Sequence, residues 1–319
     1  MLAADAFLKA SRVPLDTVLS IAVAATSAVL SQRDRMYEEP NSHFTPLLDF
    51  RDAISRSKDP ELLRSGFAAI AIDPAEIQRH LSGGAEREIT EYGQEPFRSR
   101  PLIRIEQDVF LCSDETFLTQ RLTVGARWML REHLSTKEGE ALAIAWGRLF
   151  ERAIGSRVAA SCGKRVYIPH PSIGGHELCD ALMCYGGQWA FVEYKAITVT
   201  ETAKHSGDPA RLFSELEKKL LKRSTDGKSL QIVRALSAAF ERRELTEREL
   251  GRKLPSVVYP VIVSLDPCVA SPLIERVLGD DLTRALAAAA IPAGVRIKPL
   301  TLLSAEDLVQ TLPLLKSGL

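Results

Sequence analysis

Apolar and polar positions in the first part of the chain repeat mostly with the period of an α-helix. This pattern predicts helices over residues 14–36, 46–57, 59–81 and 115–134. Residues 100–112 (RPLIRIEQDVFLC) alternate instead between apolar and polar side chains, which is typical of a short β-hairpin. The first part of the chain is therefore predicted to be mainly helical.

From about residue 137 onward, helical and strand-like segments alternate. The pattern predicts helices over 137–160, 209–223, 228–243, 272–290 and 304–315, and strands over 164–168, 177–184, 189–197, 257–265 and 295–302. Such a succession of elements indicates an α/β sandwich. We expect two domains. The first, over 1–120, is mainly helical and has a regulatory or recognition role, and the second, over 121–319, is the α/β domain.

One predicted strand is apolar almost throughout. Residues 257–265 (VVYPVIVSL) are rich in β-branched side chains, as in a strand that is buried on both faces. Pro260 argues the other way, because proline cannot donate a hydrogen bond to a neighbouring strand and occurs mainly at edges or bulges. The pattern still favours a central strand.

Composition and charge narrow the class of protein. Of the 319 residues 45% are hydrophobic and 26% are charged, which excludes a globally disordered or fibrous chain. Lys plus Arg and Asp plus Glu both number 41, so the protein is not a uniformly basic coat for nucleic acid. The charge is uneven, however: residues 1–120 carry 13 basic and 19 acidic side chains, and residues 121–253 carry 23 and 16. A polyanionic partner would bind the basic middle, although ordinary scatter explains the gradient equally well.

The remaining composition points to a reducing compartment. The five cysteines are odd in number and form no CxxC pair, so neither a disulfide framework nor a structural zinc site is expected. The N-terminus lacks the basic start of a signal peptide. Residues 17–30 are apolar but too few to span a bilayer. We expect a cytoplasmic protein that does not contact a membrane.

The most informative segment is ELCDALMCYGGQWAFVEYKA, residues 177–196. Gly186-Gly187 between two apolar, β-prone runs predicts a hairpin with a two-residue turn, since both glycines can take a positive φ. In that register Asp180 lies opposite Glu193, and Lys195 lies on the same face as Glu193 because side chains alternate along a strand. Two acids and one ammonium group are thus expected at one end of the hairpin.

Two opposed carboxylates in an apolar hairpin repel each other and need compensation. A proton, a nearby cation or a metal ion would each supply it. Carboxylate oxygens suit a hard divalent cation such as Mg²⁺, and a neighbouring ammonium can position water or stabilise negative charge that develops on a phosphate. The predicted cluster therefore favours metal-assisted phosphate chemistry.

These residues resemble the signature of the PD-(D/E)XK nuclease superfamily, which has the restriction-endonuclease-like fold. The matching residues are Asp180 and, on the next strand, Glu193-Tyr194-Lys195; Glu151 in GRLFE matches a glutamate that the family often places on the preceding helix. The order of predicted elements over about 145–265 is also the family order. Cys179 replaces a proline that many members also lack. Gln231 is not followed by the tyrosine of some exonuclease-like members, because Ala235 stands there.

The resemblance implies hydrolysis of phosphodiester bonds. Asp180, Glu193 and the backbone carbonyl of Tyr194 would hold Mg²⁺, for which Mn²⁺ can substitute, Lys195 would orient the attacking water, and Glu151 would support the metal. It further implies a DNA endonuclease in anti-phage defence or restriction, and leaves open a homodimer or a partner defence protein. RNA as the substrate is not separated from DNA. The rival interpretation is a catalytically silent module that binds nucleic acid or a partner protein.

Basic residues after the motif are candidates for contacts with nucleic acid. These are Lys218, Lys219, Lys222 and Lys228, to which Gln231 adds a polar side chain. A solvated helix face explains the lysines equally well. His176 and His170 are weaker candidates near the site, and alternation along the predicted strand would place Glu177 on the face opposite Asp180.

Overall fold

The computed structural model divides the chain into two compact units, Met1–Ala143 and Ile144–Leu319. The structure describes residues 2–38, 47–82, 95–131, 133–163, 165–204, 207–216, 219, 228–287, 289 and 291–317. The division lies within helix α9 (Thr136–Cys162), whereas the boundary predicted after residue 120 falls inside helix α7 (Glu115–Leu122). The division of the structure therefore lies later in the chain than the predicted boundary.

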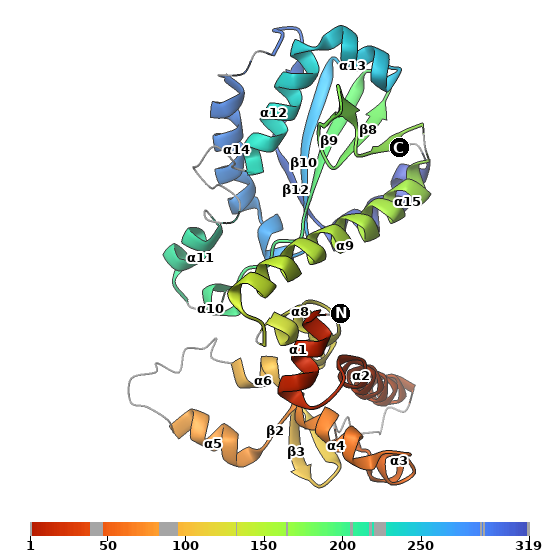
Figure 1. The fold of residues 1–319 in the computed structure, drawn as a ribbon, viewed down its shortest axis with the longest axis vertical. Coiled ribbons are helices and arrows are strands. Elements are labelled where there is room, and N and C mark those ends of the chain that lie inside the picture. Colours follow the sequence, from red (N-terminus) through yellow and green to blue (C-terminus); the bar gives the residue numbers. More distant parts are fainter. Residues whose placement is uncertain are drawn as a thin grey trace. The chain divides into compact units, whose positions relative to one another are not determined.

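The first unit combines helices with a small sheet (Figure 1). The helices are α1 (Leu2–Ser11), α2 (Leu15–Glu38), α3 (Arg51–Ser55), α4 (Pro60–Ala68), α5 (Pro74–Ser82), α6 (Glu95–Ser99), α7 and α8 (Val124–Arg131). The strands β1 (Leu47–Asp49), β2 (Ala71–Ile72), β3 (Leu102–Glu106) and β4 (Val109–Cys112) form a sheet in the order β1-β4-β3-β2. The hairpin predicted over 100–112 is confirmed, because β3 and β4 pair antiparallel.

Two helices predicted in the first unit are wrong in part. Residues 47–49 form strand β1, because their backbone pairs with β4 and Leu48 is buried against the core. The helix predicted over 59–81 is interrupted by β2, which pairs parallel with β3. Pro74 disfavours the helical conformation at Asp73, the residue before it. This favours a break between α4 and α5.

Helix α2 is the one described helix that is long and apolar enough to cross a membrane. It is longer than the apolar stretch 17–30, which was predicted to be too short. One face packs into the core of the first unit through side chains that include Val18, Ile21, Ala25 and Val29. A core helix of a water-soluble protein passes the same test of length and composition, so the finding is weak evidence for a membrane.

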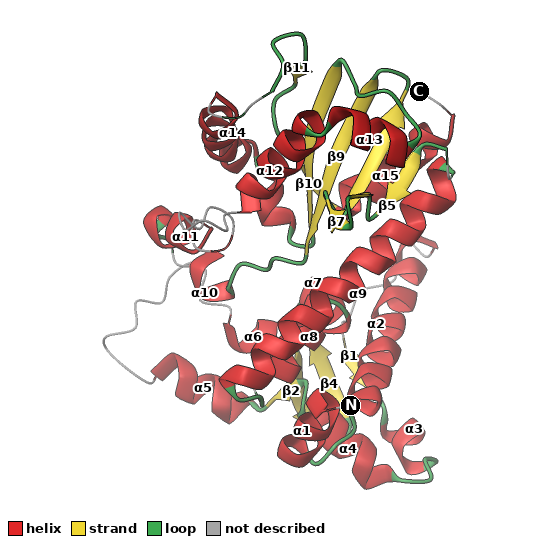
Figure 2. Cartoon of the chain, turned by 45° about the horizontal axis from the view of Figure 1, so that its top comes forward, coloured by secondary structure: helices red, strands yellow, loops and turns green. Residues whose placement is uncertain are grey.

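The second unit is built on a six-stranded mixed sheet, which confirms the predicted α/β class (Figure 2). The path is β11-β10-β9-β8-β5, with β12 beside β10; β9 and β10 are parallel, whereas β5, β8 and β9 are antiparallel neighbours. The strands are β5 (Tyr167–Pro169), β8 (Ala181–Tyr185), β9 (Gln188–Lys195), β10 (Val257–Ser264), β11 (Arg296–Ile297) and β12 (Thr301–Ser304). A separate hairpin joins β6 (Ser172–Ile173) to β7 (His176–Glu177).

Helices cover both faces of this sheet. Side chains of α12 (Lys228–Glu241) and α14 (Pro272–Ala287) share one apolar core with the sheet, and those of α9 and α15 (Ala305–Ser317) share another. Figure 1 shows the same arrangement, with α12 and α14 on one side of β9 and β10 and α15 on the other. The remaining helical segments are α10 (Glu201–Lys204), α11 (Pro209–Leu216), α13 (Arg243–Leu250) and the 3₁₀ turn η2 (Pro267–Ala270).

Strand β10 is central, as its apolar sequence predicts. On one side it pairs along its whole length with β9, and on the other it pairs with β11 at Val257–Val258 and with β12 at Val261–Ser264. Pro260 lies in the interval between those last two pairings, so its missing N–H donor interrupts neither of them. The single strand predicted over 295–302 is therefore wrong: it is two short strands that flank Pro299.

Candidate active site

The β8–β9 hairpin has the predicted register. Tyr185 pairs with Gln188 across the two-residue turn, and the ladder runs from there to Ala181 opposite Val192. Of the two turn glycines, Gly186 has a positive φ, at 58°. The apolar side chains of the hairpin are buried on both faces of the sheet. Because both faces are covered, the length of the turn fixes the register.

Asp180 lies immediately before β8, next to the last paired position, Ala181 opposite Val192. Its Oδ2 accepts a hydrogen bond of 2.6 Å from the backbone N–H of Tyr194. Asp180 thus approaches Glu193 and Lys195 across the end of the hairpin, as predicted. The chain from 178 to 180 is not part of a strand, however, because Leu178 donates its N–H to the carbonyl of Pro171 instead of continuing the ladder.

The Lys195 ammonium contacts both carboxylates. Its Nζ lies 2.5 Å from Glu193 Oε2 and 3.5 Å from Asp180 Oδ2. Glu193 is almost completely buried, with 3% of its surface exposed. Burial raises the pKa of Glu193 to about 7, and Asp180 adds to the rise, although Lys195 opposes it. One cation therefore serves two carboxylates, and the site keeps an excess of negative charge.

Burial lowers the pKa of Lys195, but Glu193 and Asp180 outweigh burial, and the net shift is upward. The ammonium is therefore charged at neutral pH. A charged group at this position can hold a water molecule by hydrogen bonds or stabilise negative charge on a phosphate.

Glu151 lies near this cluster on α9, as the resemblance of the motif implies. Burial, followed by the charge of Asp180, raises the pKa of Glu151. Its Oε1 lies 3.3 Å from Nδ1 of His170, and the same nitrogen lies 3.0 Å from Oε1 of Glu177. The backbone N–H of His170 donates to the carbonyl of Asp180. His170 and Glu177 therefore belong to the surroundings of the site.

Both residues were underestimated from the sequence. Alternation predicts that Glu177 lies on the face opposite Asp180, and this is wrong because β7 and β8 are separate strands. His170 is in a left-handed backbone conformation with φ of 46°, which turns the chain after β5. Its contact with Glu151 joins residues 19 positions apart, which no local pattern reveals. A non-glycine residue with positive φ beside the motif is a signal only once the backbone is known.

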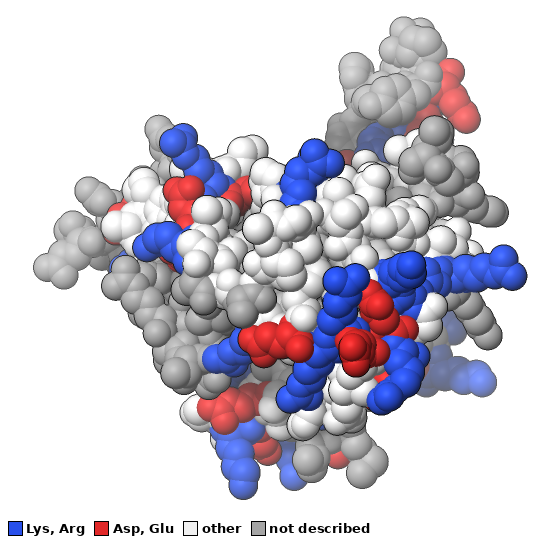
Figure 3. Space-filling view, turned by 90° about the horizontal axis from the view of Figure 1, so that it is seen from above, with Lys and Arg blue, Asp and Glu red and all other residues white. Residues whose placement is uncertain are grey.

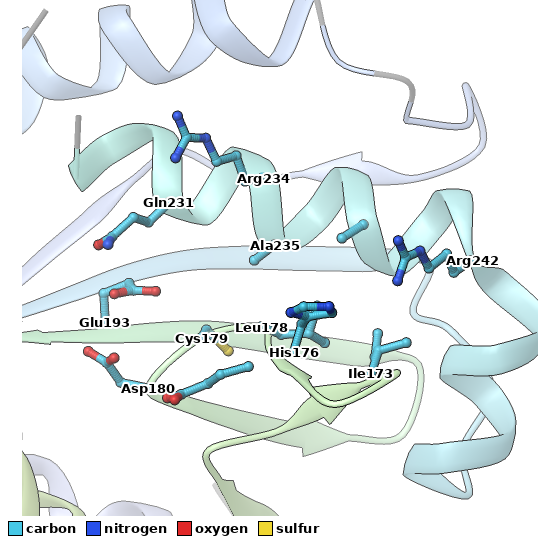
Figure 4. A pocket seen from close by; sticks show the side chains of 12 residues that line it. Ile173, His176, Leu178, Cys179, Asp180, Glu193, Gln231, Arg234, Ala235 and Arg242 are labelled. Atoms are coloured by element: carbon cyan, nitrogen blue, oxygen red, sulfur yellow. The ribbon is translucent and has the colours of Figure 1, made fainter. Parts of the chain in front are cut away.

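Asp180 lines two clefts. One, of about 510 Å³, lies on the α12 side of the sheet and also contains Glu193, His176 and Gln231. The other, of about 330 Å³, lies along α9 and contains Glu151. In Figure 4 the Gln231 side chain reaches from α12 toward Glu193. Asp180 is therefore reached from both clefts, and Glu193 from the larger one.

The predicted nucleic-acid contacts are placed unevenly. Lys218 and Lys222 lie outside the described residues, as does the side chain of Lys228 at the start of α12. Lys219 forms an ion pair with Glu215 and donates a 2.6 Å hydrogen bond to the carbonyl of Thr198, so it has a structural role. Gln231 lines the cleft with Glu193, which keeps it a candidate.

The face of the molecule drawn in Figure 3 has no broad basic area among its described residues. In Figure 3, Lys and Arg side chains lie among Asp and Glu side chains, beside a wide area without charge. A polyanion would not be attracted to this face as a whole. Contacts with phosphate would have to come from particular cations near the two clefts.

The donor set fits a hard divalent cation held by few protein ligands. Within the described ranges, no three His, Cys, Asp or Glu side chains are arranged around a common metal position. Asp180 and Glu193 nevertheless converge on one positive group. Mg²⁺ commonly takes one or two carboxylates and completes its octahedron with water and substrate phosphate. The two carboxylates therefore suit Mg²⁺ better than a metal ion whose ligands all come from the protein.

The chain was compared with protein families, curated proteins and solved structures. No family model, no curated protein and no solved structure matches the chain. The resemblance to PD-(D/E)XK nucleases therefore rests on the residues of the motif, and a function has to be argued from their geometry.

Proposed function

We propose that the protein hydrolyses phosphodiester bonds of nucleic acid in a Mg²⁺-dependent reaction, as an endonuclease on DNA. The observation that carries the proposal is the convergence of Asp180, Glu193 and Lys195 at the open end of the β8–β9 hairpin. Two carboxylates with excess negative charge attract a divalent cation, and the adjoining ammonium attracts phosphate. Both halves of a metal-assisted phosphoryl reaction are then within contact distance of each other.

Each residue has a role that its position supports. Asp180 and Glu193, with the carbonyl of Tyr194, would hold Mg²⁺, which supplies an activated water and neutralises charge on the phosphate. Lys195 orients a water or the phosphate through its ammonium hydrogens. Glu151 lies within electrostatic range of Asp180 and adds negative charge to the site.

The order of elements supports a restriction-endonuclease-like fold for the second unit. Helix α9 with Glu151 is followed by β5, then by β8 after Asp180, then by β9 with Glu193 and Lys195, and finally by α12 and β10. This is the succession that the resemblance to the PD-(D/E)XK superfamily implies. The six-stranded mixed sheet with helices on both faces supports this part of the proposal.

The test is cleavage of supercoiled plasmid with Mg²⁺, Mn²⁺ or EDTA, with wild type and Lys195→Ala. Nicking or linearisation that needs metal and is lost in the variant is the expected result. Parallel reactions on single-stranded DNA and on RNA identify the substrate. Cleavage that Lys195→Ala leaves unchanged would overturn the assignment of the site.

One observation favours a second function, a catalytically silent module that binds nucleic acid or a partner protein. The Lys195 ammonium itself lies between the two carboxylates and partly neutralises them. If this contact were permanent, the carboxylates would take up no metal. Calorimetry with Mn²⁺ separates the two functions, since a silent module shows no uptake that depends on Asp180.

A further inference from the structure

One face of α9 forms a wall of the smaller cleft. The residues that line it recur at spacings of three and four, which places them on a single side of the helix. They are Arg148, Glu151, Arg152, Gly155, Ser156 and Ala159. The cleft therefore runs along α9, with arginines at one end and small residues at the other.

The arginine end is suited to phosphate. Arg148 and Arg152 are one helical turn apart, and both side chains are exposed. Within the part of the chain that the structure describes, neither guanidinium forms an ion pair. Arginine is the side chain best adapted to hold phosphate oxygens through paired N–H donors. The two groups can therefore contact one phosphate or two successive ones.

The other end of the cleft is open because its helical residues are small. A Cβ atom added at Gly155 would come 2.9 Å from the hydroxyl oxygen of Tyr167, so glycine lets this ring lie against α9. Ser156 and Ala159 are exposed beside it and do not fill the space. A volume of about 330 Å³ leaves room for a nucleotide-sized group.

Asp180 connects this cleft with the larger one. It lines both, and the larger cleft continues past Glu193 to Gln231 and His176 on the other side of the sheet. In Figure 4 the guanidinium of Arg234 points away from the carboxylates, and the side chain of Gln231 lies toward Glu193. Polar side chains for binding a strand thus lie on both sides of Asp180.

We propose that the cleft along α9 is a phosphate-binding subsite for the nucleotides next to the bond that is cut, with Arg148 and Arg152 as its phosphate contacts. The inference rests on the proposed function and adds the path of the strand. The strand enters through one cleft, crosses Asp180 and leaves through the other. A site open on both sides accepts an internal phosphodiester, in agreement with an endonuclease.

The test is binding of a fluorescent single-stranded oligonucleotide to the full-length protein in EDTA, measured by anisotropy over a series of salt concentrations. Arg148→Gln and Arg152→Gln are each expected to weaken binding about tenfold at low salt, as expected for a lost charge-assisted contact. Each should also reduce the slope of log K against log salt by about 0.7 per lost phosphate contact.

Arg157→Gln is the matched control. Arg157 is exposed on the same helix but does not line the cleft, so its removal changes the net charge equally. It should leave the affinity within about twofold of wild type. If the Arg148 and Arg152 variants bind like Arg157→Gln, the subsite is overturned.

Two further experiments are needed. The first tests whether the shape of the cleft matters as well as its charge, and the second tests whether the cleft binds a strand or a free nucleotide. Ser156→Trp fills the cleft without a change in charge, and it should weaken binding as the arginine variants do; unchanged binding contradicts the proposal. A free mononucleotide should compete only weakly with the oligonucleotide. If calorimetry shows instead that the mononucleotide binds through Arg152 whereas the oligonucleotide does not, the cleft binds free nucleotides and the proposal is wrong.

These measurements need no cleavage. If the arginine variants lose binding but the protein never cuts, the subsite stands and the proposed function fails. If the protein cuts in a metal-dependent manner while both arginine variants bind and cut like wild type, the function stands and the subsite fails.

Discussion

Each unit buries a carboxylate beside a basic side chain, but the balance of charge differs. In the first unit Asp108, 8% exposed, receives hydrogen bonds from Arg64: Nε lies 3.1 Å from Oδ1, and Nη2 lies 2.9 Å from Oδ2. In the second unit the Lys195 ammonium faces both Glu193 and Asp180. Arg64 also contacts Glu61, whose side chain is 82% exposed, so Asp108 is the buried carboxylate that this guanidinium matches in charge and geometry. The buried Glu193 and the partly buried Asp180 share one ammonium instead.

The difference distinguishes a structural pair from a candidate reactive site. A carboxylate held by both sides of a guanidinium fork has its charge and oxygens satisfied, and it gains nothing from a further ligand. In the second cluster burial raises the pKa of Glu193 to about 7 although Lys195 opposes the rise, so a charged Glu193 carboxylate is costly there without a further cation. A divalent cation would relieve this cost, so the unbalanced cluster is where a metal is expected.

The largest expected effect is on cleavage. Asp180→Ala removes a proposed metal ligand and should reduce metal-dependent cleavage of plasmid by at least about 10³-fold, the scale of losing a preorganised electrostatic contact. Glu177→Ala is the matched control, because Glu177 is a nearby carboxylate that is half-exposed. It should cost less than about tenfold, and equal losses in both variants would contradict a special role for Asp180.

The next effect is on stability of the first unit. Arg64→Ala leaves the buried Asp108 without its cation and should lower the free energy of unfolding by about 3 kcal/mol. Arg56→Ala removes an exposed ion pair with Asp52 and should cost at most about 1 kcal/mol. Urea denaturation measures both. Similar losses would show that burial of Asp108 does not matter.

At the cluster of Asp180, Glu193 and Lys195, removal of a charge should raise the free energy of unfolding instead of lowering it. The pKa of Glu193 is raised from 4.5 in an exposed chain to about 7 in the folded protein, so the folded state binds more protons between these values. Stability is therefore lost as pH rises from about 4.5 through 7. Glu193→Gln should raise the free energy of unfolding at pH 8, without metal, by about 1–3 kcal/mol.

Thermal denaturation at pH 5 and pH 8 in EDTA measures this effect. The gain should shrink at pH 5, where the folded wild type already has a protonated Glu193. A variant that is less stable than wild type at pH 8 would show that the pair with Lys195 outweighs the excess charge.

The smallest effect concerns a balanced pair within the second unit. Burial raises the pKa of Glu215, but hydrogen bonds from Lys219 and Thr200 outweigh it and lower the pKa overall. The stability that this carboxylate adds is therefore present above about pH 4.5 and is lost as pH falls below it. Glu215→Gln should cost about 1 kcal/mol at pH 7 and little at pH 3, as followed by urea denaturation. A cost that does not change with pH would show that the charge is unimportant.

Local signals in the sequence were sufficient to predict the central hairpin. The two-residue turn at Gly186-Gly187 sets the register of the apolar runs beside it, because the length of a hairpin loop fixes which residues pair. This register brings Asp180 to Glu193 and Lys195. The central strand β10 was likewise predictable, since its residues are apolar on both faces.

Elements that depend on distant partners were missed. Residues 47–49 and 71–72 form strands because β4 and β3 offer them backbone partners, which outweighs their helical pattern. In the site, His170 and Glu177 approach Glu151 through the turn after β5 and the β6–β7 hairpin. Contacts across such turns depend on backbone angles, for which the sequence holds no periodic signal.

The most direct test of the central claim is calorimetric titration with Mn²⁺ of wild type, Asp180→Ala and Glu177→Ala. Excess negative charge at Asp180 and Glu193 predicts metal uptake by wild type and by Glu177→Ala, and its loss in Asp180→Ala. Uptake that persists in Asp180→Ala, or none in wild type, would contradict the claim that this cluster is a metal site.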